Sequence, residues 1–198
     1  GTATIIDPLC FGANGSVSIN SVGGTGVHTY LWSSGETTQS ISQPAGSYTV
    51  GVTDENGCTA TLGPFVVTDP TPILIDSAVV VDVTCGGGSN GSIDISVSGG
   101  STPYVISWIA SNGIIVPPIL NPTNLPVGVY DVTITDAGGC TSDTETYTIG
   151  GPTILTGSVS TVDSSCNPRI ENGEATITAG GGTSPYEYNF GSGFSSSD

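Results

Sequence analysis

Three segments of this chain repeat one pattern of residues, and each begins with a cysteine. Cys10 opens CFGANGSVSINSVGG, Cys85 opens CGGGSNGSIDISVSGG and Cys166 opens CNPRIENGEATITAGGG. An internal repeat constrains the possible folds more than any other sequence feature, because each copy must form one structural unit beside its neighbours. Tandem copies of a small unit usually supply length, display or avidity, and rarely form a catalytic cleft.

The repeat length divides the 198 residues into two complete units and part of a third. We expect domain boundaries at residues 1–69, 70–151 and 152–198. The pattern of the third unit stops part-way, so we expect the chain to be a slice of a longer protein. The joints VVTDPTPILI and TIGGPTILT are short and carry proline, which stiffens a connection. An elongated, semi-rigid array is therefore the expected architecture.

Apolar and polar residues alternate along the segments between turns. In GSIDISVSGG the apolar residues are Ile93, Ile95 and Val97. In YDVTITD they are Tyr130, Val132 and Ile134. This period of two is typical of half-buried strands in an antiparallel sheet. Asn-Gly and Gly-Gly dipeptides separate the strands. The pattern predicts an all-β chain of tandem Ig-like antiparallel β-sandwich domains.

The charge of the chain is strongly negative. It has 17 acidic residues and one basic residue, Arg169, which gives a formal net charge of −16. Such a chain repels phosphate backbones, so we expect no nucleic-acid partner. Its apolar runs are also too short for a membrane span, so we expect no membrane insertion. Cations and basic surfaces are the compatible partners.

Cysteine and tryptophan follow the same order in both complete units: Cys10, Trp32 and Cys58, then Cys85, Trp108 and Cys140. In Ig-like sandwiches an aromatic residue packs near an inter-sheet bridge, so both tryptophans are predicted core residues. We expect disulfides within each unit, Cys10–Cys58 and Cys85–Cys140, which leaves Cys166 unpaired within this fragment. The alternative is reduced core thiols. Disulfides would place the protein in an oxidising compartment, outside the cell.

Motifs for catalysis are missing from the sequence. No serine lies in a GxSxG elbow, no CxxC pair suggests zinc, and His28 is the only histidine. His28 lies four residues before Trp32, where the other units have Tyr104 and Tyr186, so it is predicted to be a packing residue. We therefore predict that the chain is not an enzyme and binds no organic cofactor.

Calcium is the one metal that the sequence suggests. Asp54 and Asn56 lie in the turn DENG, and Asp69 marks the first joint, so hard oxygen ligands could bind the ion there. The alternative is ordinary hairpin chemistry, because the second unit keeps only Asp136 at the equivalent turn. A further difference between the units is the apolar insertion at 111–126, which is predicted to cover its own sheet or to contact a neighbouring unit or another protein.

The order of these landmarks resembles the SprB repeat of very large surface adhesins from gliding and other Bacteroidota-type bacteria. The residues that carry the resemblance in the second unit are Cys85, Asn90 to Ser92, Gly99, Gly100, Pro103, Tyr104, Trp108, Leu125 to Gly128 and Tyr130 to Cys140. The first unit matches at Cys10, Asn14 to Ser16, Gly23, Gly24, Trp32, Pro44 to Gly46 and Tyr48 to Cys58.

The resemblance implies secretion through the type IX route, attachment to the cell surface and service as a stalk or adhesive filament, as in gliding motility. Its partners would be neighbouring repeats of the same chain, with surface glycans or other cell-surface proteins as adhesive targets. It also implies O-glycosylation at short Asp-Ser/Thr motifs, for which Ser77 in Asp76-Ser77-Ala78 is the candidate. Two alternatives are a carbohydrate-binding module, using Tyr30, Tyr147 and Tyr188, and a passive spacer in a secreted enzyme.

Overall fold

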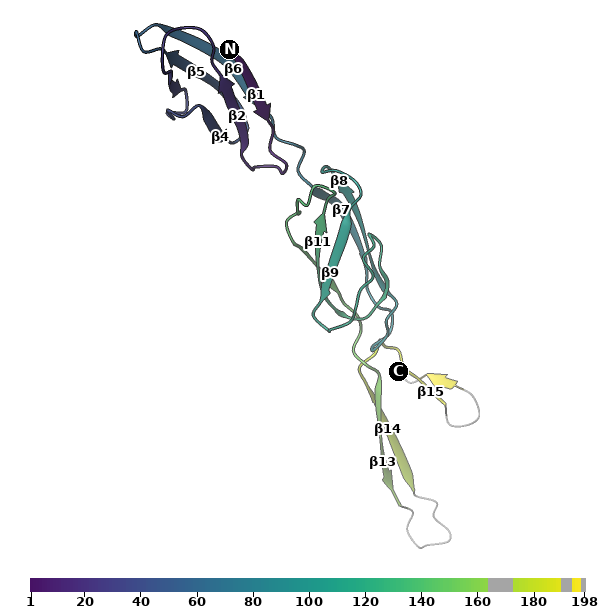
Figure 1. Cartoon of the computed structure of the whole chain (residues 1–198). Helices are drawn as coiled ribbons and strands as arrows, with labels where there is room; N and C mark the ends of the chain where they lie inside the picture. Colours follow the sequence, from purple (N-terminus) through teal and green to yellow (C-terminus); the bar gives the residue numbers. More distant parts are fainter. Residues whose placement is uncertain (164–172, 190–193, 197–198) are drawn as a thin grey trace. The chain divides into compact units, whose positions relative to one another are not determined.

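The computed structural model describes residues 1–163, 173–189 and 194–196, and every regular element in this part of the chain is a β-strand (Figure 1). The predicted all-β class is therefore confirmed. The described residues include no helix with the length and apolarity needed to span a lipid bilayer. Cys166 lies outside the described residues.

Contacts between residues divide the chain into two compact units. Unit 1 contains residues 1–76, 97–105 and 133–143, and unit 2 contains residues 77–96, 106–132 and 144–198. Strands β7, β8, β9 and β11, whose bounds are given below, contribute residues to both units. The boundaries expected from the repeat pattern stay predictions.

The first repeat forms two three-stranded antiparallel sheets in unit 1. One has the order β1-β2-β4, with β1 at Thr2–Ile6, β2 at Gly15–Asn20 and β4 at Ser40–Gln43. The other has the order β3-β5-β6, with β3 at Thr29–Trp32, β5 at Gly46–Thr53 and β6 at Thr59–Val67. In β2, buried residues alternate with more exposed ones, as the period of two predicts.

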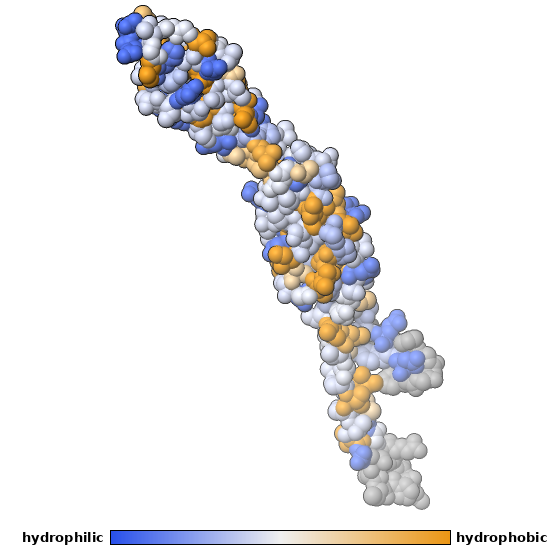
Figure 2. Space-filling model, in the orientation of Figure 1, coloured by the Kyte–Doolittle hydropathy of each residue, from blue (hydrophilic) through white to orange (hydrophobic). Residues whose placement is uncertain are grey.

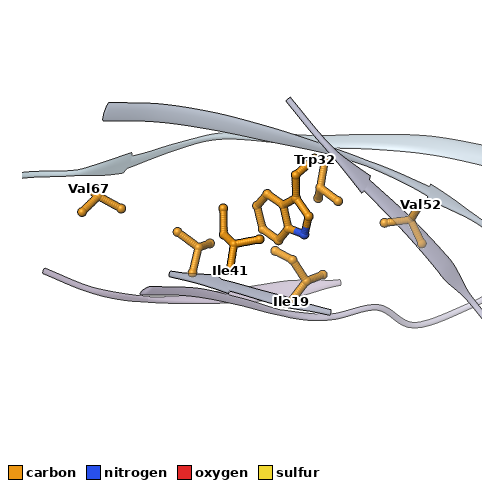
Figure 3. Packing of buried hydrophobic residues seen from close by; sticks show 7 residues of the cluster. Ile19, Trp32, Ile41, Val52 and Val67 are labelled. Carbon is orange, nitrogen blue, oxygen red and sulfur yellow. The ribbon is translucent and has the colours of Figure 1, made fainter. Parts of the chain in front are cut away.

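The two sheets of the first repeat enclose a hydrophobic core. Figure 3 shows the indole of Trp32 projecting from one layer toward Ile19 and Ile41 on the other. Trp32 is only 2% exposed, and its Nε1 donates a hydrogen bond of 2.8 Å to the carbonyl of Thr38. Burial of the ring is thus compatible with its one polar group, because that group has an acceptor. The core contains Val17, Ile19, Trp32, Ile41, Val50, Val52 and Val67.

The second repeat has the same strands in the same order. One sheet has the order β10-β8-β7, with β7 at Leu74–Val81, β8 at Gly91–Ser98 and β10 at Thr123–Leu125. The other has the order β12-β11-β9, with β9 at Val105–Ala110, β11 at Gly128–Thr135 and β12 at Glu145–Ile149.

Two hairpins follow in unit 2. Strand β13 at Thr156–Val162 pairs with β14 at Glu174–Gly180, and β15 at Glu187–Asn189 pairs with β16 at Phe194–Ser196. Ser158 faces Thr178 in the first of these hairpins, as Thr2 faces Asn20 in the first repeat. The third copy of the repeat therefore begins with the same strand pair.

The insertion at 111–126 packs against its own repeat. Its carbonyl groups at Leu120 and Pro122 accept hydrogen bonds of 3.1 Å from the backbone N–H groups of Ile95 and Ile93. Val116 is 7% exposed, whereas the adjacent Ile115 is 97% exposed. The insertion thus supplies backbone acceptors to β8 and one apolar side chain to the interior, and it leaves Ile115 in solvent.

These two neighbours give a matched test of the insertion. Val116→Ala should lower the free energy of unfolding by about 1–2 kcal/mol, because a buried side chain loses apolar contacts. Ile115→Ala should change it by less than about 0.5 kcal/mol, because that side chain buries almost nothing. Urea denaturation of the two variants makes the comparison. Equal losses would mean that the insertion does not contribute Val116 to the core.

The surface carries few charges of either sign. On the face that Figure 2 shows, residues of intermediate hydropathy cover most of the molecule, with hydrophobic and hydrophilic ones interspersed. This agrees with a composition in which only 9% of residues are charged. Solubility therefore depends on serine, threonine and backbone groups as well as on the carboxylates.

Candidate functional site

The end of the second repeat that carries Cys140 is organised by one carboxylate. The side chain of Asp136 accepts hydrogen bonds from the backbone N–H of Ser101 at 3.0 Å and of Cys140 at 2.9 Å. Two backbone bonds run beside these, from Asp136 N–H to Cys140 O at 2.9 Å and from Ala137 N–H to Ser101 O at 2.8 Å. Asp136 thereby ties the Asp-Ala-Gly-Gly-Cys turn to the glycine pair that precedes Ser101. We call this the turn end, residues 99–101 and 136–140.

The first repeat has the same turn end, at residues 23–25 and 54–58. Asp54 accepts from the N–H of Thr25 at 3.0 Å and of Cys58 at 2.8 Å. The two backbone bonds are also repeated, from Asp54 N–H to Cys58 O and from Glu55 N–H to Thr25 O, both at 3.0 Å. The DxxGC pattern therefore encodes a fixed structure, in which the carboxylate positions the cysteine after the turn.

These hydrogen bonds lower the pKa of both carboxyl groups. For Asp136 the main cause is the N–H of Ser101, followed by that of Cys140, and for Asp54 the order is Cys58 and then Thr25. Each donor stabilises the ionised form, so the pKa of each group lies below its ordinary value of 3.8. Asp54 and Asp136 are therefore structural anions at neutral pH.

Acid should weaken the turn ends for this reason. A folded-state pKa below the unfolded value means that the unfolded chain binds protons first, so the two carboxylates contribute stability above pH 3.8 that is lost as pH falls through their folded pKa values. We expect the urea midpoint to fall as the pH drops from about 4 to about 2. In Asp54→Asn/Asp136→Asn this acid-dependent fall should be smaller, with a lower midpoint at pH 7. Superimposable pH profiles would contradict the role of the two carboxylates.

His28 occupies a packing position, as its alignment with tyrosine predicts. Its Nε2 donates to the carbonyl of Gly23 at 2.9 Å, and Nδ1 lies 2.7 Å from the hydroxyl of Ser21. In the second repeat the Tyr104 hydroxyl donates to the carbonyl of Gly99, and in the third the Tyr186 hydroxyl donates to that of Gly181 at 2.6 Å. In each of the three repeats, this side chain is thus hydrogen-bonded to the equivalent glycine carbonyl.

In both complete repeats the first cysteine lies in a loop after the opening strand, which we call the loop end. In the first repeat, the side chain of Asp7 accepts from the N–H of Thr68 at 2.8 Å. In the second, Asp82 accepts from the N–H of Gly150 at 2.7 Å. These bonds fasten the loop to the strand by which the chain leaves the repeat. The loop end contains residues 7–14 with Cys10 in the first repeat, and residues 82–90 with Cys85 in the second.

A disulfide joins the loop end of the first repeat to the turn end of the second. Cys10 and Cys140 are bonded, with their Cα atoms 5.5 Å apart and a sequence separation of 130. The connecting segment lies beside the bond, because Gly100 N–H donates to Thr71 O at 3.1 Å and Ile73 is 8% exposed. Both cysteines and this segment belong to unit 1. We call the whole arrangement the joint.

Glycine at position 100 is required by this joint. Its φ is +57°, and a Cβ atom there would lie 2.7 Å from Cγ1 of Ile73 and 3.0 Å from a carboxylate oxygen of Asp136. Any other residue would collide with Ile73 in the close approach that forms the joint. The Gly99-Gly100 pair is thus part of the joint as well as a turn.

The predicted pairing within each repeat is wrong. Cys10 is bonded to Cys140, and Cys58 and Cys85 are both exposed free thiols. The physical reason lies in β6, which runs from Thr59 to Val67 and thus spans roughly 26 Å. Cys58 precedes its first residue. Pro8, two residues from Cys10, lies at its other end, because both Pro8 and Val67 approach Gly15.

Cys10 and Cys58 therefore occupy opposite ends of one sandwich, well beyond the Cα separation of about 7 Å that a disulfide tolerates. Cys85 cannot bond Cys140 because Cys140 is already paired with Cys10. The position of Cys58 directly after a turn was visible in the sequence. The direction of β6 away from that turn is the signal that would have excluded the pairing.

The two tryptophans differ in burial. Trp32 lies in the core, whereas Trp108 is half-buried, with its ring centroid 6.4 Å from that of Tyr147 and its Nε1 donating to Ile119 O at 3.0 Å. Tyr30, Tyr147 and Tyr188 lie on β3, β12 and β15, in three different sheets, and each is half-buried.

The calcium candidates are not brought together. Both carboxylate oxygens of Asp54 accept backbone N–H groups, and Asp69 follows the other end of β6. The described part of the chain holds no group of three or more His, Cys, Asp or Glu side chains that could bind a metal ion. Calcium binding at Asp54, Asn56 and Asp69 stays a prediction. Ser77, on β7, is exposed and its hydroxyl lies 2.8 Å from that of Ser96, while its glycosylation also stays a prediction.

Fold and site together define a class of protein: tandem β-sandwich-like repeats, with a disulfide between the loop end of one and the turn end of the next. The family model for the SprB repeat matches the chain twice, at residues 2–37 and 77–113. The resemblance seen in the sequence is thus confirmed in both complete repeats, and SprB is a family of structural repeats. No curated protein matches the chain.

Proposed function

We propose that this chain is a segment of an extracellular repeat array, a stalk or adhesive filament of a large adhesin attached to the cell surface. The observation that carries the proposal is the joint, because it connects successive SprB repeats by a covalent bond as well as by the chain itself. A disulfide persists in an oxidising environment, which supports an extracellular location. Repetition supplies reach, and it multiplies any weak contact through avidity.

The chemistry of the repeats supports a mechanical role. Asp54 and Asp136 have their carboxylate oxygens engaged by backbone N–H groups, and His28 is engaged by Gly23 and Ser21. The polar groups that a catalyst would need are thus used to hold turns together. We propose accordingly that the segment has no enzymatic activity, and that its partners are further repeats together with surface glycans or proteins of the opposing cell or substratum.

Surface location and adhesion can be tested separately. An antibody raised against residues 1–198 should label intact, unpermeabilised cells that make the protein, and external protease should remove the signal. Labelling that appears only after permeabilisation would exclude the cell-surface location. The purified chain should also compete with the cells for attachment to a glycan-bearing surface. Surface labelling without competition would identify a passive spacer.

A further inference from the structure

The turn end of the first repeat carries its cysteine, Cys58, as an exposed free thiol. A hollow there is lined by Gly23, Gly24, His28, Asp54 and Cys58. At the turn end of the second repeat, the corresponding hollow is lined by Gly100, Asp136 and Cys140 together with Cys10 and the segment from Pro70 to Leu74. The turn end of the second repeat is thus bonded to Cys10, whereas that of the first repeat has a free thiol.

The turn end of the first repeat has the same hydrogen bonds as the turn end of the second. The carboxylate of Asp54 accepts the same two backbone N–H groups as that of Asp136, at distances that agree within 0.1 Å. Gly57 N–H donates to Asp54 O at 3.0 Å, as Gly139 N–H donates to Asp136 O at 3.0 Å. Cys58 is therefore held in the arrangement that presents Cys140 to Cys10. It is an exposed free thiol.

We propose that the turn end of the first repeat is a docking site for the loop end of another SprB repeat, closed by a disulfide between Cys58 and the first cysteine of that repeat. The exposed thiol of Cys85 is the matching half, a loop-end cysteine that awaits the turn-end cysteine of a following repeat. The joint between Cys10 and Cys140 is then one example of a bond formed at every junction of the array. This inference goes beyond the proposed function, because it concerns how repeats are coupled and holds whatever the array binds.

The junction between the second and third repeats already has the non-covalent contacts of this arrangement. Gly182 N–H donates to Thr153 O at 2.8 Å, which reproduces the bond from Gly100 N–H to Thr71 O. Gly86, next to Cys85, lies against this segment, since a Cβ atom there would approach the carbonyl oxygen of Thr153 to 2.4 Å. The loop that carries Cys85 thus lies beside the connecting segment at this junction, and all of these residues belong to unit 2.

Closing such a joint is a two-electron oxidation. The thiolate of Cys58 attacks a disulfide oxidant such as oxidised glutathione, one glutathione thiolate leaves, and a mixed disulfide forms. The thiolate of the partner cysteine then attacks the Cys58 sulfur and releases the second glutathione thiolate. Two cysteine thiols become one disulfide, and the two electrons reduce oxidised glutathione to two thiols.

A longer chain tests the proposal directly. The test protein joins residues 1–156 to a complete second copy of residues 1–198. Gly1 of the second copy then stands where Gly157 stands in the natural chain. Cys166→Ser, Cys58→Ser in the first copy and Cys85→Ser in the second leave one candidate pair, Cys85 of the first copy and Cys58 of the second. A control chain keeps the other two cysteines, Cys58 of the first copy and Cys85 of the second. Both chains are refolded, dilute, in a glutathione buffer.

The first chain should have at least tenfold fewer free thiols than the control after denaturation, and its non-reducing peptide map should contain the Cys85–Cys58 peptide. The control should keep both thiols and form no such bond. Equal thiol content in the two chains would overturn the proposal, as would a bond from Cys58 to Cys10. Each map must also contain Cys10–Cys140 from both copies, and its absence would refute the joint on which the proposal is based.

Discussion

Replacing Cys10 and Cys140 with serine should cause a large loss of stability. The bond closes a loop of 130 residues, and in the chain-entropy model such a loop lowers the entropy of the unfolded chain by an amount worth about 5 kcal/mol. We expect the midpoint of thermal unfolding to fall by about 10–20 °C, measured by circular dichroism under non-reducing conditions. Reduction of the natural chain should reproduce this change.

The matched control is Cys58→Ser with Cys85→Ser. These two residues are of the same type and lie at the equivalent ends of the repeats, but their thiols form no bond in this chain. Their replacement should change the midpoint by no more than about 2 °C. If both double variants unfolded at the same temperature, the disulfide between Cys10 and Cys140 would be absent in solution.

Trp32→Ala should destabilise the first repeat by about 3–5 kcal/mol, the range for removing a large aromatic side chain from a packed core. The indole is 2% exposed and contacts residues from both sheets, so its loss leaves a cavity that neither sheet can close (Figure 3). It also leaves the carbonyl of Thr38 without its donor. Urea denaturation, followed by circular dichroism, measures the change.

Trp108→Ala is the matched control, because it removes the same side chain from the same position of the sister repeat. Trp108 is only half-buried, and its ring contacts Tyr147 at one side. Its replacement should cost closer to about 1 kcal/mol, the typical value for a single substitution. A larger loss at Trp108 than at Trp32 would contradict the burial described for the two repeats.

Most of the fold was predictable because local and tertiary preferences agree. Ile93 and Ile95 alternate with polar residues in the sequence, and both are buried in β8. The Asp-x-x-Gly sequences at Asp54 and Asp136 form turns, as predicted. The Asn-Gly dipeptides instead precede strands directly, because Gly15 and Gly91 are the first residues of β2 and β8. The alignment of His28 with Tyr104 was also informative, because a position that accepts either residue needs only a hydrogen-bond donor on a flat ring.

The disulfide was not predictable by counting cysteines. An even number in each repeat made pairing within the repeat the economical choice, but a bond depends on the position of the two Cα atoms in space. Cys10 and Cys58 are at opposite ends of one sandwich, so the second cysteine of a repeat is near the first cysteine of the repeat before it. Burial of Trp108 was also overestimated: the side chain is half-buried, and its indole donates to Ile119 of the insertion at 111–126, a segment that the first repeat lacks.

The bond between Cys10 and Cys140 has a consequence for a chain under tension. A pulling force that enters before Cys10 and leaves after Cys140 passes through the two sulfur atoms, and the residues between them, over a sequence separation of 130, carry none of it. Those residues would otherwise release roughly 450 Å of contour length on complete extension. In a single-molecule pulling record, this length should be missing from the oxidised protein and appear when a reductant is added.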